Sequence, residues 1–176
     1  MTPHFWEKLL ASKMLSSAAG HASAELASFS GWLITGFAAA FGLLLVNIDA
    51  VSKFLEPGKL GRAIVLFLVA VVVHVIQRWL AAITAGSIAA GKEAASAAIE
   101  GSHELDFVVV FAEMERATYR PMRWFVRKSY AKVANGDVAA AGRMQAKLAQ
   151  WQGFAVLAQL VLSVSAIAVV VVNLNV

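Results

Sequence analysis

The stretch that decides the fold is residues 154–172, FAVLAQLVLSVSAIAVVVV, in which Gln159, Ser163 and Ser165 are the only polar residues. A helix of this length extends about 28 Å, which is close to the thickness of the hydrocarbon core of a bilayer. The stretch carries no charge and no proline. It therefore predicts a transmembrane helix.

Two other stretches have the length and composition of a membrane span. Residues 29–48 are almost wholly apolar, whereas residues 60–80 contain His74, Gln77 and Arg78 in their last third. Arg78 lies near the end of that stretch, where a long side chain can extend its charge to the lipid headgroups. A mixed-charge segment precedes the first stretch and favours an uncleaved span over a removable signal peptide. The sequence thus predicts three transmembrane helices.

The composition agrees with a membrane protein and excludes several other classes. Hydrophobic residues make up 60% of the 176 residues and charged residues only 15%, whereas soluble domains average about 45–50% and about 25%. There is no cysteine, which excludes disulfides and thiolate metal sites. A soluble enzyme, a disordered tail and a disulfide-rich secreted module are therefore all excluded.

The distribution of basic residues predicts the orientation. With Arg62 and Arg78 at the ends of span two counted in the adjoining segments, the N-terminal segment and the long segment between spans two and three carry twelve Lys and Arg residues. The segment between spans one and two carries three. Basic residues near spans favour the cytoplasmic side. We therefore expect a protein of the cell (inner) membrane with a cytoplasmic N-terminus and an external C-terminus.

The expected fold class is an all-α integral membrane protein, with three transmembrane helices and a helical cytoplasmic bundle between spans two and three. Residues 1–28 would form a cytoplasmic helix, either lying in the membrane interface or packed on that bundle. Residues 29–80 would hold the first two spans, residues 81–152 the cytoplasmic helical region, and residues 153–176 the third span with a short external tail.

The cytoplasmic region is predicted to fold back on itself as several helices. Residues 81–102 are rich in Ala, Gly and Ser and contain no proline, so span two should continue as a helix. A second helix is expected from near Leu105, and Pro121 should kink or split it because it removes one backbone donor. Asn135-Gly136-Asp137 supplies a helix stop, a turn and an N-cap before the helix that leads into span three.

Polar residues inside the spans are the first candidate functional group. His74, Gln77 and Arg78 are spaced to share one side of span two, and Gln159 and Ser163 share one side of span three. Such residues can line a pore or relay protons. They can also bond to a neighbouring helix, which is a common packing device in membranes, and we favour this second interpretation for both groups.

Two stripes of residues are candidates for contacts with other molecules. Span one carries a stripe of small residues that permits close helix packing, within the chain or across a homo-oligomer. The stripe consists of Gly31, Thr35, Ala38 and Gly42. Basic residues of the cytoplasmic region, spaced to share one helix side, are Arg116, Arg120, Arg123 and Arg127. These arginines suit anionic lipid headgroups, an acidic partner or a solvated face, and nucleic acid is the least favoured ligand.

No motif for catalysis, for a cofactor or for a metal ion is present in the sequence. We therefore do not expect an enzyme, and we expect no cofactor. The leading hypothesis is a non-catalytic inner-membrane subunit that self-associates or anchors a partner through its cytoplasmic helices. The alternative is an oligomeric channel or membrane-disrupting effector, with a pore lined by the polar residues of spans two or three.

Overall fold

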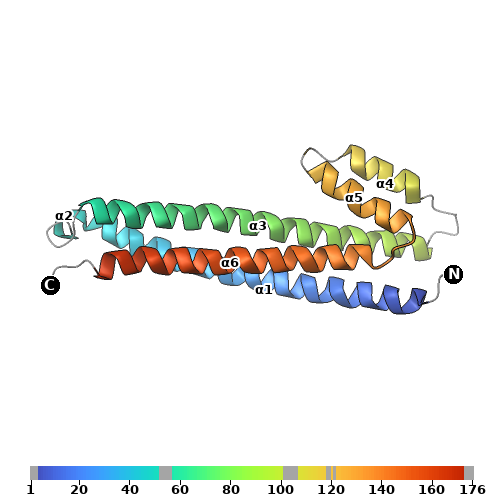
Figure 1. Cartoon of the computed structure of the whole chain (residues 1–176), viewed down its shortest axis with the longest axis horizontal. Coiled ribbons are helices and arrows are strands. Elements are labelled where there is room, and N and C mark those ends of the chain that lie inside the picture. Colours follow the sequence, from blue (N-terminus) through green and yellow to red (C-terminus); the bar gives the residue numbers. More distant parts are fainter. Residues whose placement is uncertain (1–3, 52–56, 101–106, 118–119, 121, 173–176) are drawn as a thin grey trace. The chain divides into compact units, whose positions relative to one another are not determined.

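The computed structural model describes residues 4–51, 57–100, 107–117, 120 and 122–172, and all regular structure in these residues is helical. The helices in this part of the chain are α1 (Phe5–Val46), α2 (Ile48–Val51), α3 (Pro57–Glu100), α4 (Phe107–Arg116), α5 (Met122–Ala134) and α6 (Ala140–Val172) (Figure 1). The all-α expectation is confirmed for these residues.

Three of these helices are long and apolar enough to cross a membrane, as the sequence predicted. They are α1, α3 and α6, and the span-like parts lie within Phe5–Val46, Gly58–Ser96 and Ala140–Val172. Many large apolar side chains in them are exposed: Trp32 is 77% exposed and Val161 63%. Exposed apolar surface of this extent is typical of a face that contacts lipid or another protein.

The N-terminal segment differs from the expectation of a separate helix. Helix α1 is continuous from Phe5, so the segment before the first predicted span and the span itself form one helix. No proline interrupts it, and Gly20 is accommodated within the regular helix. Thr2 and Pro3, which suit a helix cap followed by the first helical position, lie outside the described residues.

The turn between α5 and α6 has the predicted form. Gly136 adopts a φ of +84°, a left-handed conformation that a glycine reaches without steric cost. The amide of Gly136 donates to the carbonyl of Val133 (2.9 Å), and the amide of Asp137 donates to that of Lys132 (3.0 Å). These bonds close the end of α5. Pro121, where a kink was expected, lies outside the described residues.

The chain divides into two compact units, and α1, α3 and α6 contribute to both. Unit 1 comprises Met1–Ala22 and Ile83–Ala149, and unit 2 comprises Ser23–Ala82 and Gln150–Val176. Each unit is described by itself below.

Unit 2 contains the most apolar parts of the three long helices. Its buried positions recur every three or four residues, for example Gln152, Val156, Gln159, Ser163, Ala166 and Val170 on α6. This spacing is the heptad pattern of coiled coils. Towards the C-terminal end of α1 the core is apolar, and the Phe41 and Phe67 rings stack with centroids 4.6 Å apart.

Unit 1 is held by close backbone contact between α1 and α6. A Cβ atom placed on Gly142 would lie 2.6 Å from the carbonyl oxygen of Ser12 and 2.8 Å from its Cα. Nearby, a Cβ on Gly20 would meet the Ile88 side chain at 3.2 Å. The first part of α1 therefore packs on α3 and α6, which is one of the two arrangements left open for the N-terminal segment. Helices α4 and α5 lie against each other as a hairpin (Figure 1).

Replacing Gly142 should test this contact. An alanine normally stabilises a helix by about 1 kcal/mol relative to glycine, but Gly142→Ala would force α1 and α6 apart. We expect it to lower the free energy of unfolding by about 1–3 kcal/mol, as overpacked cores do. The measurement is detergent-induced unfolding of the purified protein, followed by circular dichroism.

The matched control is Gly86→Ala on α3, where a Cβ would meet no atom within 4 Å. This substitution should be neutral or stabilising. An equal loss of stability in both variants would contradict the proposed role of the close contact.

Candidate functional site

The most distinctive feature of unit 2 is a polar layer in which α1, α3 and α6 each supply one side chain. The Ser30 hydroxyl donates to Oε1 of Gln159 (2.5 Å) and lies 2.7 Å from Nδ1 of His74. The side-chain amide of Gln159 also donates to the backbone carbonyl of Ser30 (3.2 Å). Ser30 and Gln159 are fully buried. The three helices are therefore joined by hydrogen bonds in otherwise apolar surroundings.

The bonds of Ser30 fix where the proton of His74 lies. A hydroxyl has one proton, and that of Ser30 is given to Gln159. The oxygen can then only accept from His74, so Nδ1 carries the hydrogen. In the neutral ring Nε2 is left as an acceptor.

The bonding between α1 and α6 recurs at intervals of seven residues. Gln152 donates to the carbonyl of Ser23 (2.8 Å), one heptad before the pair of Gln159 and Ser30. In each of these pairs the two residues are 129 positions apart. A serine on α1 thus faces a glutamine on α6 at successive heptad positions.

Unit 1 contains a comparable polar layer of its own. The Ser16 hydroxyl donates to Oε1 of Gln145 (2.5 Å), and the amide of Gln145 donates to the Ser87 hydroxyl (3.2 Å). Ser87 in turn donates to the carbonyl of Thr84 (2.9 Å). The separation of Ser16 and Gln145 is again 129 residues. Side chains from α1, α3 and α6 are therefore linked here as well.

The structure brings together only part of the polar group expected on span two. Gln77 is buried and His74 half-buried on α3, whereas Arg78 is exposed. Gln159 and Ser163 on α6 are both fully buried, as their shared spacing indicated. Neither amide atom of Gln77, nor the hydroxyl of Ser163, has a hydrogen-bond partner within the described residues.

Sequence reasoning missed the partners of this group. Ser30, Ser23 and Gln152 supply the observed bonds, and none of them was among the candidate residues. The signal was present in the sequence, because Ser16, Ser23 and Ser30 are spaced by seven, as are Gln145, Gln152 and Gln159.

The small-residue stripe of span one does not pack within the chain. A Cβ on Gly31 or Gly42 would meet no atom within 4 Å, and Thr35 and Ala38 are exposed. Among the described residues the tightest glycine contact lies at Gly142 instead. The stripe was expected to pack either within the chain or across a homo-oligomer. These exposed positions are compatible with contact to another molecule.

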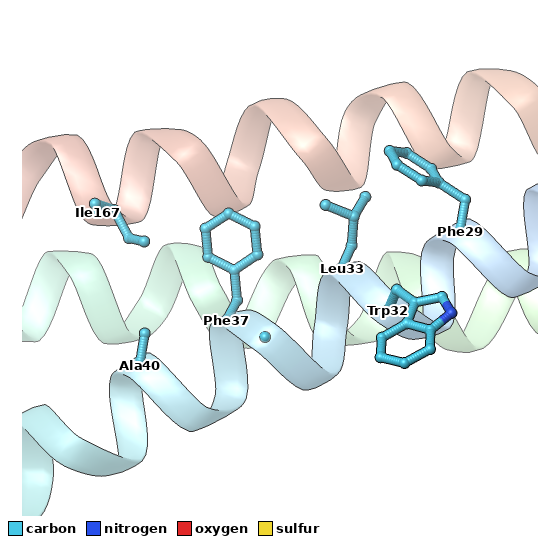
Figure 2. Close-up of a pocket in the computed structure, with 7 residues that line it drawn as sticks. Phe29, Trp32, Leu33, Phe37, Ala40 and Ile167 are labelled. Atoms are coloured by element: carbon cyan, nitrogen blue, oxygen red, sulfur yellow. The ribbon is translucent and has the colours of Figure 1, made fainter.

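A shallow apolar groove of about 330 Å³ also opens on unit 2 between α1 and α6. Figure 2 shows Phe29, Leu33 and Phe37 along one side of α1, with Ile167 of α6 beside them. Binding sites for small molecules normally add a few polar groups that orient the ligand. Among the lining side chains of this groove, only Trp32 carries a polar group, its indole N–H.

The predicted arginine stripe is divided between two helices. Arg116 ends α4, Arg120 lies in the turn, and Arg123 and Arg127 lie on α5. Arg116 pairs with Glu113 (2.6 Å), and Arg123 pairs with Glu115 of the neighbouring helix (3.3 Å). The four arginines therefore do not lie on one continuous helix, because α4 ends at Arg116 and α5 begins at Met122.

The comparisons with known proteins give no relative. No protein-family model matches the chain, and neither a curated protein nor a solved structure matches it significantly.

Substitution of Ser30 should reveal the energetic importance of the polar layer. Ser30→Ala would leave the Nδ1 hydrogen of His74 and Oε1 of Gln159 without a partner. An unsatisfied buried polar group costs about 1–3 kcal/mol, so we expect the free energy of unfolding to fall by about 2–4 kcal/mol. The measurement is unfolding of the full chain in detergent micelles.

Ser96→Ala is the control, because Ser96 is exposed and bonds only to the carbonyl of Lys92 in its own helix. It should change stability by less than about 0.5 kcal/mol. If Ser30→Ala is equally mild, the layer does not contribute to stability.

Proposed function

We propose that the protein is a non-catalytic subunit of the cell membrane that inserts through unit 2 and self-associates or anchors a partner through the helices of unit 1. The observation that carries this proposal is the distribution of polarity in unit 2. Many of its large apolar side chains are exposed, whereas Ser30, His74 and Gln159 face one another and form hydrogen bonds inside the unit. In a bilayer, polar groups must find partners inside the protein, and these three side chains meet that condition.

The same distribution speaks against a pore, which is the alternative function. Gln77, Gln159 and Ser163 are fully buried within one chain, so they are not exposed to line a channel between several chains. Within one chain, an apolar cluster that includes Phe41 and Ala166 lies next to the polar layer along the helices. A continuous polar path through unit 2 is therefore not supported.

Ion flux into liposomes tests the choice between these functions. We expect liposomes that contain the purified protein to be no more permeable to protons or K⁺ than empty liposomes. His74→Ala should not change this result. A conductance that rises with the amount of protein and falls in His74→Ala would contradict the proposal and support a channel.

Self-association can be tested on the exposed face of α1. Leucine at Gly31 or Gly42 should reduce the size of the particle in mild detergent, measured by light scattering, whereas Gly36→Leu is the control off the stripe. None of the three glycines has an atom within 4 Å of its Cβ position, so the fold of the chain should tolerate each leucine. Equal effects in all three variants, or no effect, would remove the stripe as an interface.

The orientation belongs to the proposal as well. We infer a cytoplasmic N-terminus and a cytoplasmic unit 1 from the excess of Lys and Arg in these parts of the sequence. The chain has no cysteine, so single cysteines at Ser52 and Ser102 can be labelled in intact cells. We expect an impermeant reagent to label Ser52→Cys from outside and to leave Ser102→Cys unlabelled. Labelling of both would overturn the three-span topology.

The anionic face of the membrane is the partner that α5 fits best. This helix carries Arg123, Arg127, Lys128 and Lys132 and no acidic residue. Trp124 is 60% exposed, and the ammonium group of Lys128 lies 5.1 Å from its ring centroid. Aromatic rings beside cations are common at membrane interfaces. Each basic group near an anionic leaflet contributes about 1 kcal/mol.

Neutralising the cations of α5 that pair with no carboxylate of the described residues should weaken lipid binding. In Arg127→Gln/Lys128→Gln/Lys132→Gln we expect the affinity of the full chain for an anionic phospholipid to fall about tenfold or more, with a smaller difference at high salt. Native mass spectrometry with anionic and zwitterionic lipids measures it. The control Lys8→Gln/Lys13→Gln/Lys92→Gln removes the same charge elsewhere. Equal losses in both triple variants would contradict a specific role for α5.

A further inference from the structure

We propose that unit 2 holds an internal water molecule, bound by the side chains of Gln77, Gln159 and His74. The inference starts from Gln77, which is 0% exposed and whose amide nitrogen and oxygen both lack a hydrogen-bond partner within the described residues. A buried amide without partners is strongly unfavourable, so groups of this kind in folded proteins are almost always paired with protein or water.

The register of the helices shows why the protein does not supply the partners. Ser30 contacts His74, and Phe41 stacks on Phe67, so α3 runs antiparallel to α1. The pairing of Ser30 with Gln159 and of Ser23 with Gln152 shows that α6 runs parallel to α1.

The next level of unit 2 lies three residues, or about 4.5 Å, along each helix from the polar layer. It contains Ala27 on α1, Gln77 on α3 and Val156 on α6. All three are buried, and the side chains of Ala27 and Val156 offer no polar atom. The small side chain of Ala27 leaves more room at this level than a larger residue would. Gln77 therefore sits in an apolar layer directly beside the polar one.

The direction of the side chains brings Gln77 towards the polar layer. Side chains on a helix tilt towards its N-terminus, so Gln77 tilts towards the level of His74. Because α6 is antiparallel to α3, Gln159 tilts the opposite way, towards the level of Gln77. Gln152 tilts away from this level and already donates to Ser23.

The unused hydrogen-bonding groups around this position match a water molecule. Gln159 donates one N–H to Ser30 and has a second N–H to give. His74 uses Nδ1 towards Ser30, which leaves Nε2 as an acceptor in the neutral ring. With the amide of Gln77 these make three partners, and buried waters typically make about three hydrogen bonds.

A metal cation fits these groups less well. None of the three side chains carries a negative charge, and the guanidinium of Arg78 belongs to the residue next to Gln77. Cation sites in proteins rely on carboxylates or on many oxygen ligands. Water, which both donates and accepts, suits a mixture of N–H groups, a carbonyl and a ring nitrogen. This inference depends only on the interior of unit 2 and does not rest on the proposed function.

Water-edited solid-state NMR of the full chain in lipid bilayers tests the site. In the natural sequence, the side-chain amides of Gln77 and Gln159 should receive magnetisation from water at short mixing times, whereas Ala27 and Val156 should not. In Gln77→Leu, the transfer to Gln159 should be lost. The proposal would be overturned if Gln77 received no more magnetisation from water than Ala27 does. It would also be overturned if the transfer to Gln159 were unchanged in Gln77→Leu.

Two further variants make the result specific. Ser163→Ala removes a buried hydroxyl of α6 that also lacks a partner within the described residues, and it should leave the water signal of Gln77 unchanged. Loss of the signal in this variant would place the water elsewhere and contradict the assignment. Gln77→Met serves in place of Gln77→Leu if the branched side chain prevents folding.

Discussion

Hydrogen bonds between short hydroxyl side chains and glutamine amides are the interaction on which the rest of the structure depends. The helices of unit 2 expose apolar side chains, as helices in a lipid bilayer do. Burying more apolar side chains between such helices gives little preference for one arrangement over another. Polar groups that must find partners inside the protein do give such a preference. Ser30, His74 and Gln159 do this in unit 2, and Ser16, Gln145 and Ser87 do it in unit 1. Each layer ties all three long helices at a defined level.

Length and composition were sufficient to predict the helices that could cross a membrane and the helical continuation of the second one. Residues 154–172 contain so few polar groups that no other element suits them, and the turn at Gly136 follows from local sequence. The continuity of α1 was harder to predict, because nothing in the sequence distinguishes a helix that stops before a span from one that runs through it. The residues that pack on Ser12 and Gly20 of α1 are Gly142 and Ile88, which lie on other helices.

The candidate site was predicted in part. Gln159, Ser163, His74 and Gln77 were recognised as buried polar groups, because polar residues are rare in such stretches. Their partners were missed, since Ser30 lies far away in sequence and a single serine in an apolar helix carries little information. The seven-residue spacing of serines and glutamines would have linked them. For the glycines, spacing alone was misleading: Gly31 and Gly42 face no other part of the chain, whereas Gly142 touches backbone.

The contact at Gly142 has a consequence for the uniqueness of the fold. Because the serines and glutamines both repeat every seven residues, a shift of one helix by seven residues creates similar pairs. If α6 moved by one heptad along α1, Ser16 would face Gln152 and Ser23 would face Gln159. Two serine–glutamine pairs would then remain of the present three. In that arrangement Ala149 would take the place of Gly142 opposite Ser12, and its methyl group would overlap the Ser12 backbone. The absence of one methyl group therefore distinguishes the observed alignment from this shifted one, in which two of the three hydrogen-bonded pairs would survive.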